Sequence, residues 1–118
     1  MVEKDFIGKT VVVTEGAGII GKAIGTAFAG AGARVAVCDR NLDAARDAAR
    51  ALRASSADAE GFQVDLGRRG DLAANYNIDL NLNGGTVYLT RLVLPHMIAQ
   101  GGGSIIFTSS VCGVTGLR

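Results

Sequence analysis

Three glycines with a fixed spacing separate a β-branched run from a helical pattern of apolar residues. They are Gly16, Gly18 and Gly21, and the β-branched run before them covers residues 10–14. A dinucleotide pyrophosphate is negatively charged and must approach the backbone closely, which a turn without side chains permits. The start of a helix adds unpaired N–H groups and a partial positive charge. The spacing therefore predicts a phosphate-binding turn.

An acidic residue follows at the distance that such a turn requires. Asp39 ends the apolar run 34–39, 18 residues after Gly21. A carboxylate at this place accepts hydrogen bonds from the adenosine ribose hydroxyls and repels a 2′-phosphate, so we expect NAD rather than NADP. Arg40 argues for NADP because a guanidinium can bind that phosphate, but we give Asp39 more weight. The alternative for the glycines is that they only pack and cap the elements around them.

The segments that position these residues alternate between strand and helix patterns. Apolar residues recur with helical spacing in 23–31 and again in 42–53, where Asn41 can cap the helix. A third short strand is predicted at 61–65. The resulting β-α-β-α-β order is typical of one half of a doubly wound parallel sheet, the Rossmann fold of the α/β class. The predicted apolar face of the first helix comprises Ala23, Ile24, Ala27, Phe28 and Ala31.

The composition narrows the function classes. Of 118 residues, 48% are hydrophobic and 19% are charged, and the net charge is +1, so nothing drives binding to nucleic acid or to acidic membranes. The sequence contains neither an apolar run of about 18 residues nor the apolar core of a signal peptide. Two cysteines and one histidine form no recognisable metal site. We expect a single cytoplasmic domain over residues 1–118 that binds no metal, nucleic acid or membrane.

The second half of the chain carries motifs that are more specific than the glycines. Asn81-Leu82-x-Gly84 precedes Leu94-Pro95-x-Met97, and Gly103-Ser104-Ile105-Ile106 leads into Ser109-Ser110-x-x-Gly113. With these motifs the chain resembles the classical type of the short-chain dehydrogenase/reductase family over nearly its whole length. The first two motifs resemble the family helix that holds an active-site Asn, and the last resembles the strand that delivers the catalytic Ser.

The resemblance implies roles for individual residues. Ser110 would hydrogen-bond the substrate carbonyl or hydroxyl oxygen, and Asn81 would support a water-linked proton relay. Asp65 and Leu66 would flank the adenine, although Asp65 could equally be a turn residue. His96 is expected to be an exposed helix residue rather than a base. With the glycine-rich turn, the complete set of predicted cofactor-binding residues is Gly16, Gly18, Ile20, Gly21, Asp39, Arg40, Asp65 and Leu66.

The glycine pattern departs from that of the family at two positions. Glu15 stands where the family has a Gly after Thr14, and Ile19 stands where the classical pattern has another Gly. Gly18 and Gly21 instead match the spacing of the extended members of the family. A Glu adds bulk and negative charge beside the pyrophosphate turn, so Glu15→Gly is expected to tighten NAD binding.

The sequence is also shorter than the family pattern. Residues 67–74 cannot hold the helix and strand that the family has after the third strand, and no Asn-Asn-Ala-Gly motif follows. The family's Tyr-x-x-x-Lys is absent from these residues, since Tyr76 is followed four positions on by Leu80 and Tyr88 by Leu92. We favour the interpretation that the sequence is an incomplete record of a longer polypeptide, with segments missing near 67–75 and after 118. The alternative is a genuine truncated or deleted product.

These observations predict an NAD(H)-dependent oxidoreductase that interconverts a secondary alcohol and a ketone by hydride transfer. The resemblance implies a small-molecule substrate and a homodimer or homotetramer. A first alternative is a non-catalytic nucleotide-binding module that lacks the Tyr and Lys. A second is a Rossmann enzyme of another family, against which the motifs of the second half argue.

Overall fold

The structure is a computed structural model of residues 1–118 that describes residues 4–65, 87 and 89–106. The chain divides into two compact units, residues 1–68 and 69–118, which we describe separately. The first unit contains three strands and two helices, and the second contains one helix among its described residues. No helix of the described residues is long and apolar enough to cross a membrane.

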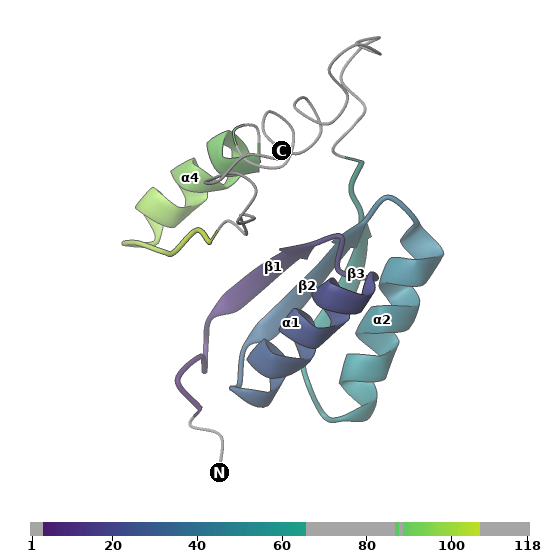
Figure 1. The fold of residues 1–118 in the computed structure, drawn as a ribbon. Coiled ribbons are helices and arrows are strands. Elements are labelled where there is room, and N and C mark those ends of the chain that lie inside the picture. The colour runs from purple at the N-terminus through teal and green to yellow at the C-terminus, as the bar shows by residue number, and fades with distance from the viewer. Residues whose placement is uncertain (1–3, 66–86, 88, 107–118) are drawn as a thin grey trace, which may run out of the picture. The chain divides into compact units, whose positions relative to one another are not determined.

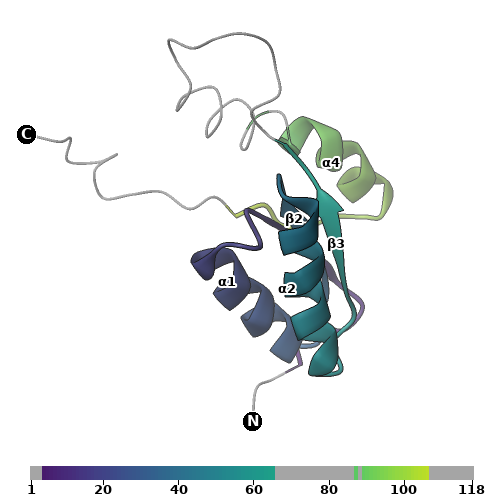
Figure 2. The same cartoon turned by 90° about the vertical axis from the view of Figure 1, so that its right-hand side faces the viewer.

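The first unit has the predicted β-α-β-α-β order. Strands β1 (Thr10–Thr14), β2 (Arg34–Asp39) and β3 (Ala59–Gln63) form a parallel sheet in the order β1-β2-β3. The connections are helices α1 (Ile19–Gly30) and α2 (Leu42–Ala54). Both helices lie on the same face of the sheet in Figure 1 and, turned by 90°, in Figure 2. The parallel sheet with helical crossovers confirms the predicted fold class.

The core lies between the sheet and helix α2. Val35 and Val37 of β2 are each 2% exposed and face Ala45 and Ala49 of α2, which are fully buried. Asn41 caps this helix as predicted, because its side chain accepts a hydrogen bond from the Ala44 amide at 3.1 Å. The small alanine side chains allow α2 to lie close to the sheet.

Helix α1 packs through glycines and through only part of the predicted apolar face, of which Ile24 contacts the core. Gly21 and Gly25 are its buried residues, whereas Ala23 and Ala27 are exposed. A Cβ added to Gly25 would meet Leu52 at 3.5 Å and Val35 at 3.7 Å, so the glycine lets α1 approach both α2 and β2. The predicted face was therefore wrong in part, because glycines have no hydrophobic side chain for the pattern to register.

Strand β3 begins two residues earlier than predicted and ends at Gln63. Ala59 pairs with Val35 and is 4% exposed, so pairing with β2 extends the strand at its start. A Cβ on Gly61 would lie 2.6 Å from the Ala45 carbonyl oxygen, which shows how closely α2 crosses this strand. Tertiary packing thus sets the position of β3 in a segment with little β-branched character.

The second unit contains helix α4 (Leu89–Ala99), which has Pro95 in its interior. The helix ends where the Gly102 amide donates to the Met97 carbonyl at 2.8 Å, with Gly101 at φ +88°. His96 is exposed on α4, as predicted. Residues 103–106, where the sequence predicts the start of a strand, form no strand within the described part of this unit.

Candidate functional site

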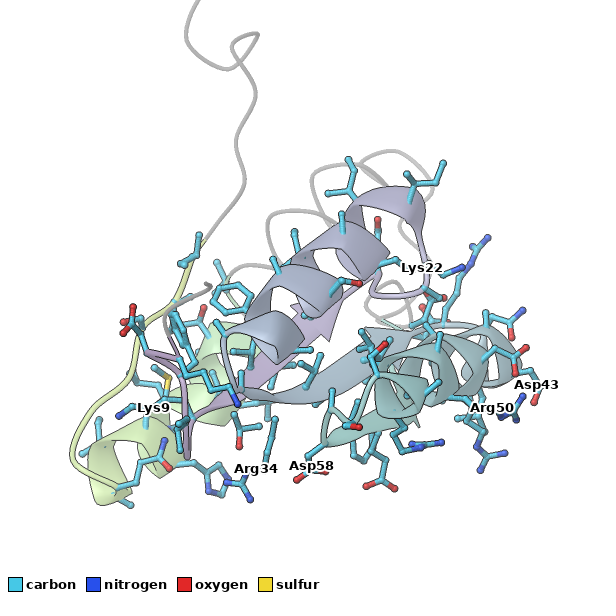
Figure 3. The ribbon with its side chains drawn as sticks, turned by 90° about the horizontal axis from the view of Figure 1, so that it is seen from below. Lys9, Lys22, Arg34, Asp43, Arg50 and Asp58 are labelled. Atoms are coloured by element: carbon cyan, nitrogen blue, oxygen red, sulfur yellow. The ribbon has the colours of Figure 1, made fainter. Side chains whose placement is uncertain are left out.

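The candidate site lies at the edge of the sheet where the three strands end. Parallel strands bring their carboxyl ends to one edge, and ligands of open α/β sheets bind there. The turn after β1 contacts the end of β2, because the Gly16 amide donates to the Cys38 carbonyl at 2.9 Å. This hydrogen bond makes the predicted phosphate turn and the strand-end acid Asp39 neighbours. The strands begin at the opposite edge, which carries Lys9, Arg34 and Asp58 (Figure 3).

The sharp bend of this turn occurs at Glu15. Its φ is +50°, in the left-handed region, whereas none of Gly16, Gly18 and Gly21 has a positive φ. The Gly18 amide closes the turn by donating to the Glu15 carbonyl at 3.0 Å, and Gly18 is the N-cap of α1. A left-handed conformation is unfavourable for a residue with a Cβ. Glu15 thus adopts the backbone conformation for which a Gly is best suited.

Two of the three glycines are required by packing within the protein. A Cβ on Gly16 would lie 2.8 Å from the Val13 carbonyl oxygen and 2.8 Å from Val37 Cγ1. A Cβ on Gly21 would collide with the Glu15 carbonyl oxygen and lie 2.6 Å from Gly16 Cα. Both residues are buried. Because neither residue has a side chain, the turn can pack closely against the sheet and against the start of α1.

Gly18 differs from the other two glycines. It is exposed, and a Cβ there would meet only the Glu15 carbonyl oxygen, at 3.2 Å. A Cβ this close to a backbone oxygen is a tight contact, so a side chain at Gly18 would require a shift of a few tenths of an ångström. No other atom of the described residues is met within 4 Å, so the start of α1 is otherwise open.

The first turn of α1 presents free backbone amides beside Gly18. Lys22 is the first helix residue whose amide bonds back, to the Gly18 carbonyl at 2.9 Å. The amides of Ile19, Ile20 and Gly21 have no hydrogen-bond partner among the described residues. The side chains of Ile19 and Ile20 are 91% and 74% exposed. Unpaired amides at a helix start favour an anionic ligand group.

Asp39 ties the phosphate turn to the loop after β2. One carboxylate oxygen, Oδ2, accepts from the Ala17 amide at 3.3 Å, and the other, Oδ1, accepts from the Asn41 amide at 3.1 Å. The side chain is half-buried at the end of β2. The carboxylate is thus held in one orientation at the edge where a ribose next to the phosphate turn would lie.

An open groove continues from Asp39 toward the end of β3. It is a shallow depression, largely open to solvent, with a volume of about 560 Å³. Its charged residues are Arg40, Asp43 and Asp65, and Figure 3 labels Asp43 at the start of α2. The groove is lined by Arg40, Asn41, Leu42, Asp43, Gln63 and Asp65. The structure thus brings Arg40 and Asp65, both predicted site residues, to one groove.

Gln63 belongs to this groove and was not predicted. It is the last residue of β3, and its side-chain amide donates from Nε2 to the Arg40 carbonyl at 3.1 Å. The available sequence signal is a long polar residue at the end of a strand, two positions before Asp65. That signal is weak, because such residues are common wherever a strand reaches solvent.

Cys38 lies next to Asp39 but is buried, at 7% exposure. Burial raises the pKa of its thiol above the usual value. The side chain is thus a neutral core residue rather than a nucleophile. Within residues 4–65, 87 and 89–106, no three His, Cys, Asp or Glu side chains lie together as a metal site would require.

Three predicted residues lie outside the described residues. They are Leu66 beside the adenine and the catalytic candidates Asn81 and Ser110. Their roles stay predictions.

The described residues fit a dinucleotide with one unfavourable feature. The open position at Gly18, the free amides of Ile19 and Ile20 and the oriented carboxylate of Asp39 match a pyrophosphate followed by a ribose. The exposed carboxylate of Glu15 belongs to the same turn and opposes the phosphate charge. The backbone geometry of the turn thus suits a dinucleotide, whereas the charge of Glu15 makes the turn less favourable for the pyrophosphate.

Comparison with protein families identifies the same architecture. The family model described as short chain dehydrogenase matches residues 9–77 and 70–118, two segments that overlap at 70–77. A short chain dehydrogenase/reductase, dpmpG, from Macrophomina phaseolina (strain MS6) is 44% identical over 50 residues, which are 42% of this chain and 29% of the relative.

Solved structures extend the likeness in three dimensions. A hydroxysteroid dehydrogenase from Escherichia coli superposes with a TM-score of 0.76 at 25% identity, over 85% of this chain and 57% of that one. A protein from Beutenbergia cavernae, to which an NAD(P) dependent gluconate 5-dehydrogenase activity is ascribed, superposes with a TM-score of 0.87 at 23% identity. The superposition covers 98% of this chain and 59% of the Beutenbergia cavernae protein, which holds NADP at low occupancy. The chain thus spans less than two thirds of the length of these relatives.

Proposed function

The chain belongs to the short chain dehydrogenase family, and from this premise we propose that it is an NAD(H)-dependent oxidoreductase that interconverts a secondary alcohol and a ketone. The observation that carries the proposal is the junction of the phosphate turn with Asp39. The Ala17 amide of that turn donates to the Asp39 carboxylate at 3.3 Å, so a pyrophosphate site and a ribose acceptor adjoin. The family assignment supports the oxidoreductase class, and this junction supports the dinucleotide.

Charge favours NAD over NADP at this place. A carboxylate at the end of β2 accepts from the 2′- and 3′-hydroxyls of the adenosine ribose and repels a 2′-phosphate. Asp39 is held in position from both sides by the Ala17 and Asn41 amides. NADP is the second candidate, favoured by the Arg40 guanidinium in the adjoining groove and by the NADP bound to the Beutenbergia cavernae protein.

Each part of the cofactor has residues of this chain to hold it. Gly18 and the amides of Ile19, Ile20 and Gly21 would bind the pyrophosphate, and Gly16 would shape the turn beneath it. Asp65, with the neighbouring Leu66, would flank the adenine at the end of β3. A bound nicotinamide supplies the carbon that gives hydride to, or takes it from, the substrate carbon.

Two residues of the second unit complete the proposal. Ser110 would donate its hydroxyl hydrogen to the substrate oxygen, where negative charge develops as a ketone is reduced. Asn81 would hold a water in a chain that delivers the proton. Both assignments follow from the resemblance of their motifs to those of the family. We further propose that the protein is cytoplasmic, forms a homodimer or homotetramer, and acts on a small-molecule alcohol or ketone.

A non-catalytic nucleotide-binding module is the second candidate function. The observation in its favour is that neither Tyr76 nor Tyr88 is followed four positions on by a Lys. Such a module would bind an adenine nucleotide but would not consume NADH in the presence of any ketone.

Titration and turnover together test the proposal. We expect NADH to bind the full polypeptide more tightly than NADPH, as measured by the change in nicotinamide fluorescence, and NADH to be oxidised with members of a ketone panel. Binding without oxidation favours the module, and tighter binding of NADPH makes NADP the cofactor. Absence of binding to either dinucleotide overturns the proposal. Intact-mass measurement of the purified polypeptide tests whether it is longer than these 118 residues, because a mass near 12.1 kDa contradicts that expectation.

A further inference from the structure

Gln63 occupies a place from which it can control the residues that distinguish the two dinucleotides. It is paired in register with Asp39 on the neighbouring strand, so the two residues end adjacent strands at the same edge. Its side chain lines the groove together with Arg40 and Asp65. Gln63 therefore contacts the loop after β2 without belonging to it.

Several hydrogen bonds hold this loop, and Gln63 makes the one that reaches Arg40. The Val64 amide donates to the Asp39 carbonyl at 2.9 Å, continuing the sheet pattern. The Asn41 amide donates to the Asp39 carboxylate at 3.1 Å. Between them, the Arg40 carbonyl accepts from Gln63 Nε2 at 3.1 Å. The peptide between Arg40 and Asn41 is thus fixed by a side chain from β3.

The Arg40 side chain depends on this peptide for its direction. Among the described residues, its guanidinium has no hydrogen bond or ion pair, and the residue is exposed. No side-chain partner therefore fixes where its charge lies. The backbone at Arg40, which Gln63 holds, determines the side of the groove that the guanidinium can reach.

We propose that Gln63 is a positioning residue that sets the preference between NAD(H) and NADP(H) by fixing the backbone of Arg40. The inference rests on the proposed function and names a selectivity determinant of the same site. Asp39 repels a 2′-phosphate and Arg40 attracts one, so selectivity depends on how far each charge lies from the ribose. Loss of the Gln63 hydrogen bond frees the Arg40 peptide to rotate and lets the guanidinium approach a 2′-phosphate.

Gln63→Met tests the proposal, because methionine has a similar length and lacks the donor. We expect the ratio of the NADPH Kd to the NADH Kd, measured by fluorescence titration, to fall at least fivefold. The matched control is Glu60→Gln, an exposed residue of the same strand that does not line the groove. Its ratio is expected to equal that of the wild type. Gln63→His, whose imidazole can donate to the Arg40 carbonyl, is expected to recover part of the wild-type ratio.

The ratio separates positioning from a general structural effect. If both Kd values rise by the same factor in Gln63→Met, or if neither changes, Gln63 does not set selectivity and the inference is overturned. In either case the wild-type protein still binds NADH, so the proposed function stands. A wild-type protein that binds neither dinucleotide overturns both proposals.

Discussion

The Asp39 carboxylate accepts a hydrogen bond from the backbone amide of Ala17, 22 positions earlier in the chain. Its other oxygen accepts from the Asn41 amide. One side chain therefore connects the phosphate turn, the end of β2 and the loop that leads into α2. The residue proposed to bind the ribose also organises the turn proposed to bind the pyrophosphate.

Replacing Asp39 is expected to affect stability and binding together. Asp39→Ala leaves two backbone amides without their acceptor, which costs about 1–3 kcal/mol of unfolding free energy. NADH binding is expected to weaken about ten- to a hundredfold, because a lost hydrogen bond to a charged acceptor costs about 1.5–3 kcal/mol. Urea denaturation and fluorescence titration measure the two effects.

Asp58→Ala is the control for Asp39→Ala. Asp58 is an exposed acid at the opposite edge of the sheet (Figure 3), and its removal changes the net charge equally. We expect wild-type NADH affinity from this variant. Equal weakening in the two variants would mean that overall charge, and not the position of Asp39, governs binding.

The glycines of the turn are expected to divide into structural and ligand-binding residues. Gly21→Ala places a Cβ against the backbone of Glu15 and Gly16, which cannot yield, and overpacking of this kind costs about 1–3 kcal/mol or more. Gly18→Ala is expected to cost less, about 1 kcal/mol, because alanine is a poorer N-cap and its Cβ would meet the Glu15 carbonyl oxygen at 3.2 Å. Its NADH affinity is nevertheless expected to fall about tenfold or more, because the added methyl group occupies the approach of the phosphate.

Gly30→Ala provides the control for this glycine series. A Cβ at Gly30, the last residue of α1, meets no atom within 4 Å. We expect wild-type binding and equal or higher stability, measured by urea denaturation. If Gly18→Ala binds NADH as well as Gly30→Ala does, the pyrophosphate does not lie over Gly18.

The sequence correctly predicted those elements whose residues form a distinctive local pattern. The β-branched run of β1 and the apolar run of β2 have the predicted bounds, Thr10–Thr14 and Arg34–Asp39. Asn41 was predicted as a cap because its side chain acts on the backbone three residues away. These features depend on local interactions, so neighbouring residues suffice to predict them.

Features that depend on contacts distant in the chain were missed or misplaced. The buried face of α1 is formed by Gly21 and Gly25, whose importance arises from how closely the helix approaches β2 and Leu52. The hydrogen bond from Gln63 to Arg40 joins residues 23 positions apart. Asp39 was predicted at its strand end, but its bond to Ala17 requires the turn to fold back onto β2.

Cys38 is expected to be unreactive in the folded protein. Burial raises its pKa above the ordinary value of 9.0, so the thiol stays protonated at pH 8, and only the thiolate reacts with a disulfide reagent. In native protein we expect labelling to be slow, and in urea to be fast. Cys38→Ser identifies this thiol, because the other cysteine, Cys112, is still present in that variant.

The same shift predicts how stability depends on pH. The unfolded state loses the Cys38 proton near pH 9 while the folded state keeps it, so above that pH the folded state binds more protons. The contribution of this thiol to stability is full below pH 9 and is lost as pH rises toward the folded pKa. Urea denaturation of wild type and Cys38→Ser between pH 8 and 10 measures the difference, and parallel curves would contradict the assignment.

Replacing Glu15 is expected to tighten NADH binding and to relieve backbone strain. It stands at φ +50°, a conformation that costs a residue with a Cβ about 1–2 kcal/mol, and its carboxylate opposes a pyrophosphate. Glu15→Gly removes both costs, although the freer unfolded chain offsets part of the gain in stability. We expect NADH to bind about five- to tenfold more tightly, since removing a like charge near 4 Å in water is worth about 1 kcal/mol.

Two further substitutions at Glu15 separate charge from strain. Glu15→Gln removes the charge and keeps the Cβ, so it should tighten NADH binding without raising stability. Glu15→Asn also removes the charge and tolerates the left-handed conformation, so it should improve both. Titration with NADH measures the affinity of the three variants, and urea denaturation measures their stability independently. Weaker NADH binding in Glu15→Gly would show that the pyrophosphate does not lie on this turn.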